Sequence, residues 1–259
     1  MITATGAMIG LAVAIVLIVK KFNPAYSLII GSLLGGLLGG AGLTDTVSFM
    51  IKGAQGMMPA ILRIVTAGVL AGVLIETGAA NKIAETIVDK MGENKAIFAL
   101  VISTFILTAV GVFIDISVIT VSPIALALAK RVNVSKTSIL IAMIGGGKCG
   151  NIISPNPNTI AASESFNIPL TSVMFAGIIP SIVGIVITVI IASSLTRKGV
   201  KIVDSDIEVG TEIKEKPSFT ASIIGPVFAI LLLALRPIAN IVIDPLVALP
   251  VGGLIGCIA

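Results

Sequence analysis

The chain reads Gly145-Gly146-Gly147-Lys148-Cys149-Gly150-Asn151-Ile152-Ile153-Ser154-Pro155-Asn156-Pro157-Asn158-Thr159 between two apolar runs. Glycines allow backbone conformations that other residues resist, and prolines keep a regular helix from continuing. In lipid, irregular backbone must be enclosed by protein or by a watery cavity, because its amides need partners. The stretch therefore predicts a broken helix over residues 138–166 that carries a binding site. The residues expected to form the unwound break are Gly145, Gly146, Gly147, Gly150, Pro155 and Pro157.

The composition is that of a membrane protein. Hydrophobic residues make up 56% of the 259 residues and charged residues 12%, with a mean hydropathy of +1.14. A soluble domain of this size needs more charge to cover its surface. The net charge of +4 comes from basic residues in short loops, so no nucleic-acid partner is expected. The sequence lacks histidine, and Cys149 and Cys257 have no metal or redox spacing, so neither a metal nor a cofactor is expected.

Apolar runs predict an all-α polytopic protein of the cell (inner or plasma) membrane. The first expected membrane spans are Ile2–Val19, Pro24–Leu43, Met57–Ile75 and, later in the chain, Leu170–Leu195. Gly31, Gly35 and Gly39 recur at a four-residue spacing that allows helices to approach closely. Over Ala79–Lys95, charges of both signs surround apolar residues at helical spacing. This pattern predicts a short amphipathic helix at the membrane surface.

Residues 96–129 consist of two apolar arms around Asp115, each shorter than the roughly 20 residues that a helix needs to cross a bilayer. A re-entrant hairpin with Asp115 near its tip and a pair of tightly packed spans both fit this pattern. Lys and Arg lie mostly on one side of the resulting topology, which places the N-terminus outside the cytoplasm. The hydrophilic residues 196–219 are then a cytoplasmic linker loop.

The organisation predicted is a first transmembrane repeat over residues 1–195, the linker 196–219 and the start of a second transmembrane half over 220–259. The chain ends inside an apolar run, so we expect it to be truncated. Many transporters consist of two inverted repeats with the substrate site between them. We therefore interpret this chain as one half of an inverted-repeat transporter.

The polar groups of the break suit a small hydroxylated anion. The ammonium of Lys148 and the N-terminus of the following half-helix, capped by Asn158 or Thr159, both offer positive charge to a carboxylate. Amides and hydroxyls nearby would bind the hydroxyl groups of such an anion. The predicted substrate-binding residues are Lys148, Asn151, Ser154, Asn156, Asn158 and Thr159. In the alternative interpretation, Lys148 only pairs with a buried carboxylate such as Asp115 or Glu164.

Asp115 and Glu164 are the candidate carriers of a coupling proton, because a carboxyl group removed from water retains its proton more readily. The alternatives are that Asp115 is a hairpin-tip residue in water and that Glu164 is a counter-ion of Lys148. Sodium is the second candidate coupling ion, since unwound carbonyls around residues 145–151 would coordinate it.

Four features follow one another along the chain: the segment Val112-Phe113-Ile114-Asp115, a proline-containing arm, a basic loop, and Ser154-Pro155-Asn156-Pro157-Asn158-Thr159-Ile160-Ala161-Ala162. Together they resemble the gluconate permease family of the ion-transporter superfamily. The resemblance covers the whole chain, as the N-terminal half or somewhat more of such a permease. It implies proton symport of a small organic acid, with gluconate, related sugar acids, glycerate, hydroxy acids and D-serine within the family's range. Gluconate-type members carry histidine in the matching Pro-x-Pro loop and glutamate at the position of Asp115. This chain has Asn156 and Asp115 and gains Lys148, which predicts a different substrate or coupling scheme.

Other classes of protein fit the sequence less well. It contains no HExxH, no GxSxG and no histidine for a catalytic dyad, so an enzyme is not expected. A sodium-coupled carboxylate carrier and a channel or structural membrane subunit are kept as alternatives to proton symport. The expected partners are the lipid bilayer and a small organic anion, and a homo-oligomer is left open.

Overall fold

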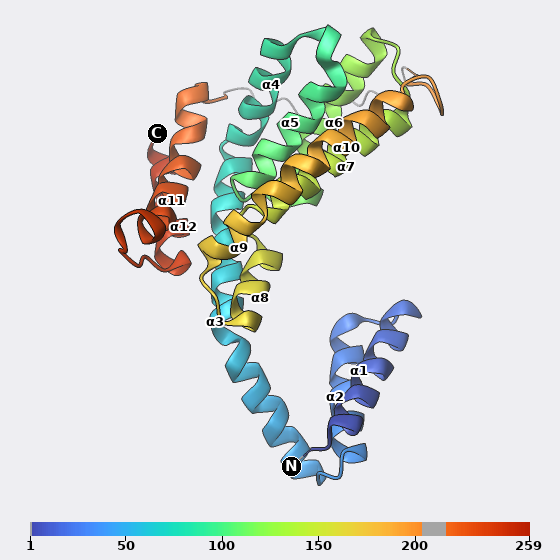
Figure 1. The fold of residues 1–259 in the computed structure, drawn as a ribbon, viewed down its shortest axis with the longest axis vertical. Helices are drawn as coiled ribbons and strands as arrows, with labels where there is room; N and C mark the ends of the chain where they lie inside the picture. Colours follow the sequence, from blue (N-terminus) through green and yellow to red (C-terminus); the bar gives the residue numbers. More distant parts are fainter. Residues whose placement is uncertain (1, 204–215) are drawn as a thin grey trace. The chain divides into compact units, whose positions relative to one another are not determined.

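The computed structural model describes residues 2–203 and 216–259, in which every regular element is a helix (Figure 1). This confirms the predicted all-α class. The middle of the linker predicted over 196–219 lies outside the described residues. In chain order, with a short 3₁₀ turn at Glu93–Lys95, the helices are α1 (Ala4–Val19), α2 (Pro24–Leu38), α3 (Leu43–Glu76), α4 (Ala79–Met91), α5 (Ala96–Ala109), α6 (Ile114–Arg131), α7 (Lys136–Ile152), α8 (Pro157–Phe166), α9 (Leu170–Ala176), α10 (Ile178–Ser194), α11 (Phe219–Ala239) and α12 (Pro245–Ile258).

The chain forms two compact units, Met1–Pro59 and Ala60–Ala259, and α3 runs from one into the other. Helix α3 has 34 residues and begins earlier than the span predicted at Met57–Ile75. The boundaries predicted around residues 195–219 between a first transmembrane repeat, a linker and a second half stay a prediction.

In the first unit, α1 and α2 pack tightly against each other in opposite directions (Figure 1). A Cβ atom added to Gly10 would lie 2.5 Å from the carbonyl oxygen of Gly31 and 2.7 Å from the Cα of Gly35. Only residues without side chains allow such an approach, as expected from the four-residue glycine spacing. The loop between the helices ends at Asn23, whose side chain caps α2 by accepting the N–H of Ala25 at 2.9 Å.

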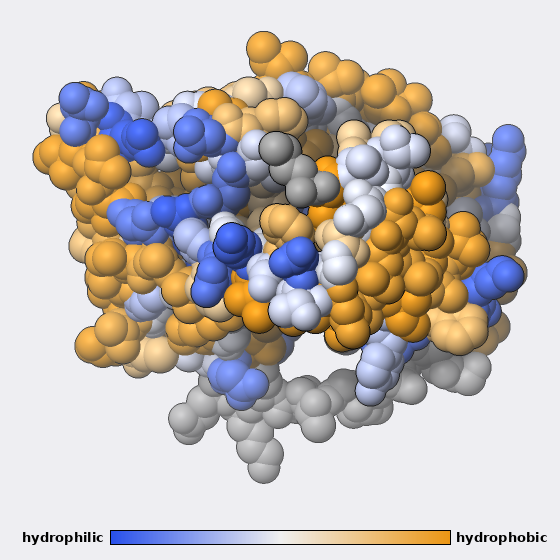
Figure 2. Space-filling model, turned by 90° about the horizontal axis from the view of Figure 1, so that it is seen from below, coloured by the Kyte–Doolittle hydropathy of each residue, from blue (hydrophilic) through white to orange (hydrophobic). Residues whose placement is uncertain are grey.

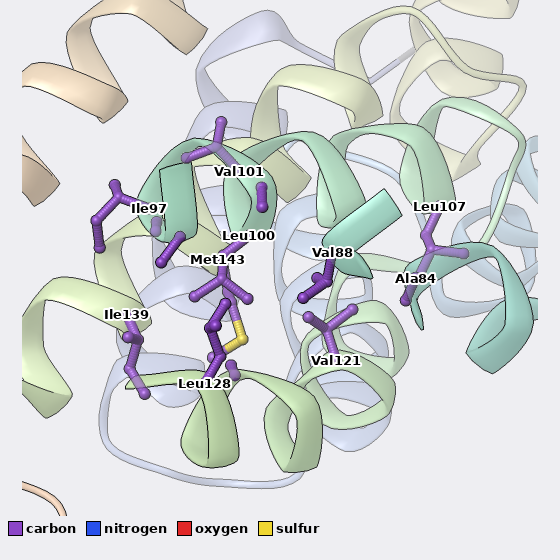
Figure 3. Packing of buried hydrophobic residues seen from close by; sticks show 14 of the residues in the cluster. Ala84, Val88, Ile97, Leu100, Val101, Leu107, Val121, Leu128, Ile139 and Met143 are labelled. Carbon is purple, nitrogen blue, oxygen red and sulfur yellow. The ribbon is translucent and has the colours of Figure 1, made fainter. Parts of the chain in front are cut away.

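The core of the second unit lies between α4, α5, α6 and α7. Figure 3 shows its side chains meeting, among them Val88 of α4, Leu100 of α5, Val121 of α6 and Met143 of α7. Helix α4 is the amphipathic helix that the sequence predicts, but its apolar face packs on protein. Ala80, Ile83 and Ala84 are at most 1% exposed. The bend of 104° at Gly92 turns α4 back against α5, and the prediction that α4 lies at the membrane surface stays a prediction.

The two arms predicted over residues 96–129 are the helices α5 and α6. They are joined by a turn at 110–113 in which Gly111 has a φ of 108°, and they pack against each other and against α7. Pro123 lies inside α6. The re-entrant hairpin stays a prediction.

Three described helical segments are long and apolar enough to cross a membrane: α3, the pair α9–α10 over Leu170–Ser194, and α11. The bent pair α4–α5 is a fourth if it counts as one span, whereas α1, α2 and α12 are apolar but shorter. Large hydrophobic side chains such as Ile179, Val186 and Ile190 of α10 are exposed. Hydrophobic residues cover wide areas of the face in Figure 2. Surfaces of this kind need lipid or protein to cover them.

Candidate functional site

The break in the helix is shorter and later than the sequence predicts. Gly145, Gly146, Gly147 and Gly150 all lie within the continuous helix α7, and only residues 153–156 separate α7 from α8. The prediction of an unwound backbone at these four glycines was therefore wrong. Pro155 lies in the break, and Pro157 is the first residue of α8, where its missing N–H costs no hydrogen bond.

The glycines of α7 serve helix packing instead. A Cβ atom on Gly146 would lie 2.6 Å from the hydroxyl of Thr104, and one on Gly150 would lie 2.9 Å from the backbone nitrogen of Ala109. Both contacts are with α5, the helix that packs most extensively on α7. The glycines thus allow two helix backbones to meet, which is the use expected of small residues between membrane helices.

The break satisfies its own polar groups through a capping box. The Asn156 Oδ1 accepts the N–H of Asn158 at 2.7 Å and that of Thr159 at 3.4 Å, while the Thr159 hydroxyl accepts the N–H of Asn156 at 3.1 Å. The Asn156 Nδ2 donates to the Ser154 hydroxyl at 2.9 Å and to the carbonyl of Asn151. The cap is therefore Asn156, not Asn158 or Thr159 as expected.

Three of the predicted substrate ligands, Ser154, Asn156 and Thr159, thereby have partners within the break. Ser154 is 0% and Asn156 1% exposed, and their side chains hold the break together. The first-turn N–H groups of α8 also have partners, since those of Asn158, Thr159 and Ile160 all donate to Asn156. The expectation that these amides would face an anion was wrong. At the N-terminal end of α8, only the helix dipole is left to attract an anion.

A cavity of about 460 Å³ lies beside the break and gathers the remaining predicted ligands. We call it the Lys148 cavity. Lys148 and Asn151 are three residues apart and so share one face of α7. Within the part of the chain that the structure describes, no hydrogen bond engages the side-chain amides of Asn151 and Asn158, and no ion pair engages Lys148. The lining residues are Lys148, Asn151, Ile152, Asn158, Thr159, Ala162, Val173, Ala176, Gly177 and Pro180.

A second cavity, of about 300 Å³, lies against the other side of α8, and we call it the Arg63 cavity. Arg63 of α3 forms ion pairs there with Glu164 of α8 and Asp244, the residue that caps α12. Its Nε and Nη2 contact the two Asp244 oxygens at 3.2 and 2.6 Å, a bidentate arrangement. Glu164 is thus the counter-ion of Arg63, and the suggestion that it pairs with Lys148 was wrong. Arg236 also lines this cavity.

Sequence reasoning missed Arg63, Arg236 and Asp244 as members of a site. An arginine within an apolar span is itself a signal, because a charge at membrane depth needs a partner. Its partner Asp244 lies 181 residues away along the chain, which no local pattern reveals.

Asp115 lies in the first turn of α6 and is exposed. It is not among the residues that line the Lys148 or the Arg63 cavity. Its neighbour Ile114 packs on α7, since a Cβ on Gly147 would lie 2.8 Å from Ile114 Cγ1. The turn that carries Asp115 therefore contacts α7 next to Lys148. Its role as a proton carrier stays a prediction.

A helical membrane chain with charged cavities beside a broken helix has the features of a transport protein. The family model of GntP family permeases matches residues 2–254, and the chain belongs to this family. This confirms the resemblance to gluconate permeases and the assignment to a multi-pass membrane protein that is not an enzyme.

Three relatives show how far the similarity extends. The chain is 59% identical over 255 residues to an uncharacterised transporter of Haemophilus influenzae, covering 98% of this chain and 61% of the relative. It is 28% identical over 249 residues to a gluconate permease of Bacillus licheniformis, covering 90% of this chain and 54% of the relative. It is 22% identical over 245 residues to a D-serine transporter of Escherichia coli, also covering 90% and 54%. The chain thus spans between half and two thirds of the length of these relatives, and no solved structure matches it.

Proposed function

We propose that the intact protein is a secondary active transporter that takes up a small organic acid, gluconate or a related sugar or hydroxy acid, by proton symport. The observation that carries the proposal is the Lys148 cavity, which combines the ammonium of Lys148 with the side-chain amides of Asn151 in α7 and Asn158 in α8, none of them paired with another described side chain. Family membership supports it, and relatives of the chain include a gluconate permease and a D-serine transporter. All of these compounds carry a carboxylate together with hydroxyl or amino groups.

The chemistry of the cavity fits such a solute. The ammonium of Lys148 is a compact point charge with three donors, which suits a carboxylate. The amides of Asn151 and Asn158 each offer donors and an acceptor to hydroxyl groups. Val173, Ala176 and Pro180 form an apolar wall that would limit water around the bound anion. A cavity with few polar groups among apolar ones is typical of small-molecule sites.

The coupling ion is proposed to be a proton, with Asp115 and Glu164 as its candidate carriers. The argument for sodium at residues 145–151 loses its basis, because these residues are helical and their carbonyls point along the helix toward the next turn. The sequence of this chain contains no histidine, the usual proton carrier near neutral pH. We therefore choose the proton carrier among its carboxyl groups.

The test is uptake of radiolabelled gluconate, glycerate and D-serine by vesicles that contain the full-length protein, under an imposed proton or sodium gradient. We expect saturable uptake of one of these compounds that shows counterflow and that an uncoupler abolishes. Uptake that rises linearly with concentration would indicate a channel instead. Uptake driven only by the sodium gradient would indicate a sodium-coupled carrier.

The Lys148→Ala variant tests the cavity itself. Loss of a charge-assisted contact costs about 1.5–3 kcal/mol, so KM should rise by about ten- to a hundredfold. Lys201→Ala, a loss of the same charge from an exposed position after α10, is the matched control and should leave KM unchanged. An unchanged KM in Lys148→Ala would exclude this cavity as the substrate site.

A further inference from the structure

We propose that the Arg63 cavity is a second carboxylate-binding site, in which a small carboxylate exchanges with the side chain of Glu164 on the guanidinium of Arg63. The inference rests on the proposed function for the identity of the carboxylate that enters. It assigns a binding role to Arg63 and Arg236 and a competitive role to Glu164.

The cavity is built from parts of the chain that are far apart in sequence. Arg63 comes from α3, Glu164 from the last turn of α8, and Asp244 from the residue before α12. Their side chains are partly exposed, at 24%, 27% and 39%, so the ion pairs border open space instead of being sealed in the core. The cavity is also lined by the apolar Ile160, Leu170, Leu233 and Ile243, so its charges interact more strongly than they would in bulk water.

The two carboxylates on Arg63 are held unequally. Asp244 forms two hydrogen bonds with Arg63, and its Oδ1 also accepts the N–H of Leu246 at 2.9 Å as the cap of α12. Glu164 has only its ion pair with Arg63 among the described residues, and it lies two residues before the end of α8. The C-terminal end of a helix repels a negative charge. Glu164 is therefore the carboxylate that an entering anion displaces from Arg63, while Asp244 keeps Arg63 in place.

Arg236 is the cation of the cavity that is left for an added anion. Its described lining holds the cations Arg63 and Arg236 and the anions Glu164 and Asp244. Arg236, in the last turn of α11, has no ion pair within the described ranges. A guanidinium presents a planar fork that matches a carboxylate. An entering carboxylate would thus take the place of Glu164 on Arg63 and would also find Arg236 in the lining of the cavity.

Exchange on Arg63 would link anion binding to proton binding. Once Glu164 loses its cation, the charged form of its carboxylate is less favoured, so it takes up a proton from water. The protonated side chain no longer competes for Arg63. The other charged groups that face it, Arg63, Arg236 and Asp244, keep their charges, so a single proton accompanies each anion.

The experiment is a calorimetric titration of the purified full-length protein with gluconate, and with acetate as a bare carboxylate, at acid and at alkaline pH. All variants are made in a Lys148→Ala background, so that the Lys148 cavity does not contribute. We expect the background protein to bind more weakly at alkaline pH. Glu164→Gln, which removes the competing charge, should bind about tenfold more tightly at alkaline pH and lose the pH dependence. Arg236→Gln should bind at least about tenfold more weakly.

Glu85→Gln is the matched control, because Glu85 of α4 forms an ion pair with Lys216 and does not line this cavity. It should change neither affinity nor pH dependence. Unchanged or weaker binding in Glu164→Gln, or no binding of either compound by the background protein, would overturn the inference. Since Glu164→Gln retains the Arg63–Asp244 pair, misfolding is not expected to obscure the result. Calorimetric binding without uptake by vesicles would contradict the proposed function and leave this inference standing.

Discussion

The side chains of Asn156 and Thr159 cap α8 reciprocally: each accepts the backbone N–H of the other, at 3.1 Å to the Thr159 hydroxyl and 3.4 Å to the Asn156 amide oxygen. Both residues are at most 5% exposed. The Pro-x-Pro segment, which the sequence predicts as a surface for substrate, is therefore also the device that ends one helix and starts the next. Asn156 therefore builds the break, whereas Asn158 faces the Lys148 cavity. Mutations of these two residues should have different effects.

Asn156→Ala should destabilise the fold. It removes the cap of α8 and the donor to Ser154, and loss of such a cap costs about 0.5–2 kcal/mol. Asn158→Ala is the control, since Asn158 is exposed and its side chain makes no hydrogen bond in the described structure. Thermal unfolding of the two purified variants in detergent measures the difference. Equal melting temperatures would mean that the capping box does not stabilise the break.

Asn158→Asp should separate stability from transport. A negative charge in the first turn of a helix is compatible with its dipole, so the melting temperature should stay the same or rise slightly. The same charge faces the Lys148 cavity and would repel a carboxylate, so uptake should fall by about tenfold or more. Asn94→Asp, at an exposed position in the turn before α5, adds an equal charge elsewhere as a control. Normal uptake by Asn158→Asp would place the anion outside this cavity.

Gly146→Ala should loosen the contact between α5 and α7. The added methyl group would overlap the carbonyl of Val101 and the hydroxyl of Thr104, and overpacking of this kind costs about 1–3 kcal/mol. Gly72→Ala is the matched control, because an added Cβ there meets nothing within 4 Å and alanine favours a helix. Melting temperatures of both variants in detergent test this. A Gly146→Ala protein as stable as Gly72→Ala would show that the α5–α7 packing can relax.

Asp115→Asn should uncouple transport if Asp115 carries the proton. Uphill uptake driven by a proton gradient should disappear, while exchange of labelled for unlabelled substrate should persist, because exchange needs no net proton movement. Both rates can be measured in the same vesicles. Asp45→Asn, a change in the first turn of α3, is the control. Unaltered uphill uptake would leave Glu164 as the remaining candidate carrier.

The sequence by itself determined the class of the protein and the existence of most helices. Runs of apolar residues predict membrane helices at any position, because lipid requires every backbone amide to be paired within the segment. Local signals also predicted close packing at the glycines of α2 and the amphipathic helix α4, and they placed Pro155 and Pro157 in the break between two helices. The resemblance to the gluconate permease family came from several motifs, of which residues 154–162 are the most specific, and the family model over residues 2–254 confirmed it.

Only the tertiary structure decided how the glycines of α7 are used and which charges meet. A glycine run is compatible with an unwound segment or with close packing, and the presence of α5 against α7 selected packing. Arg63 and Asp244 meet although 181 residues separate them, because the folding of α3, α8 and α11–α12 around one cavity brings them together. Hydrophobic burial depends on local composition, whereas charge pairing depends on distances that only the folded chain defines.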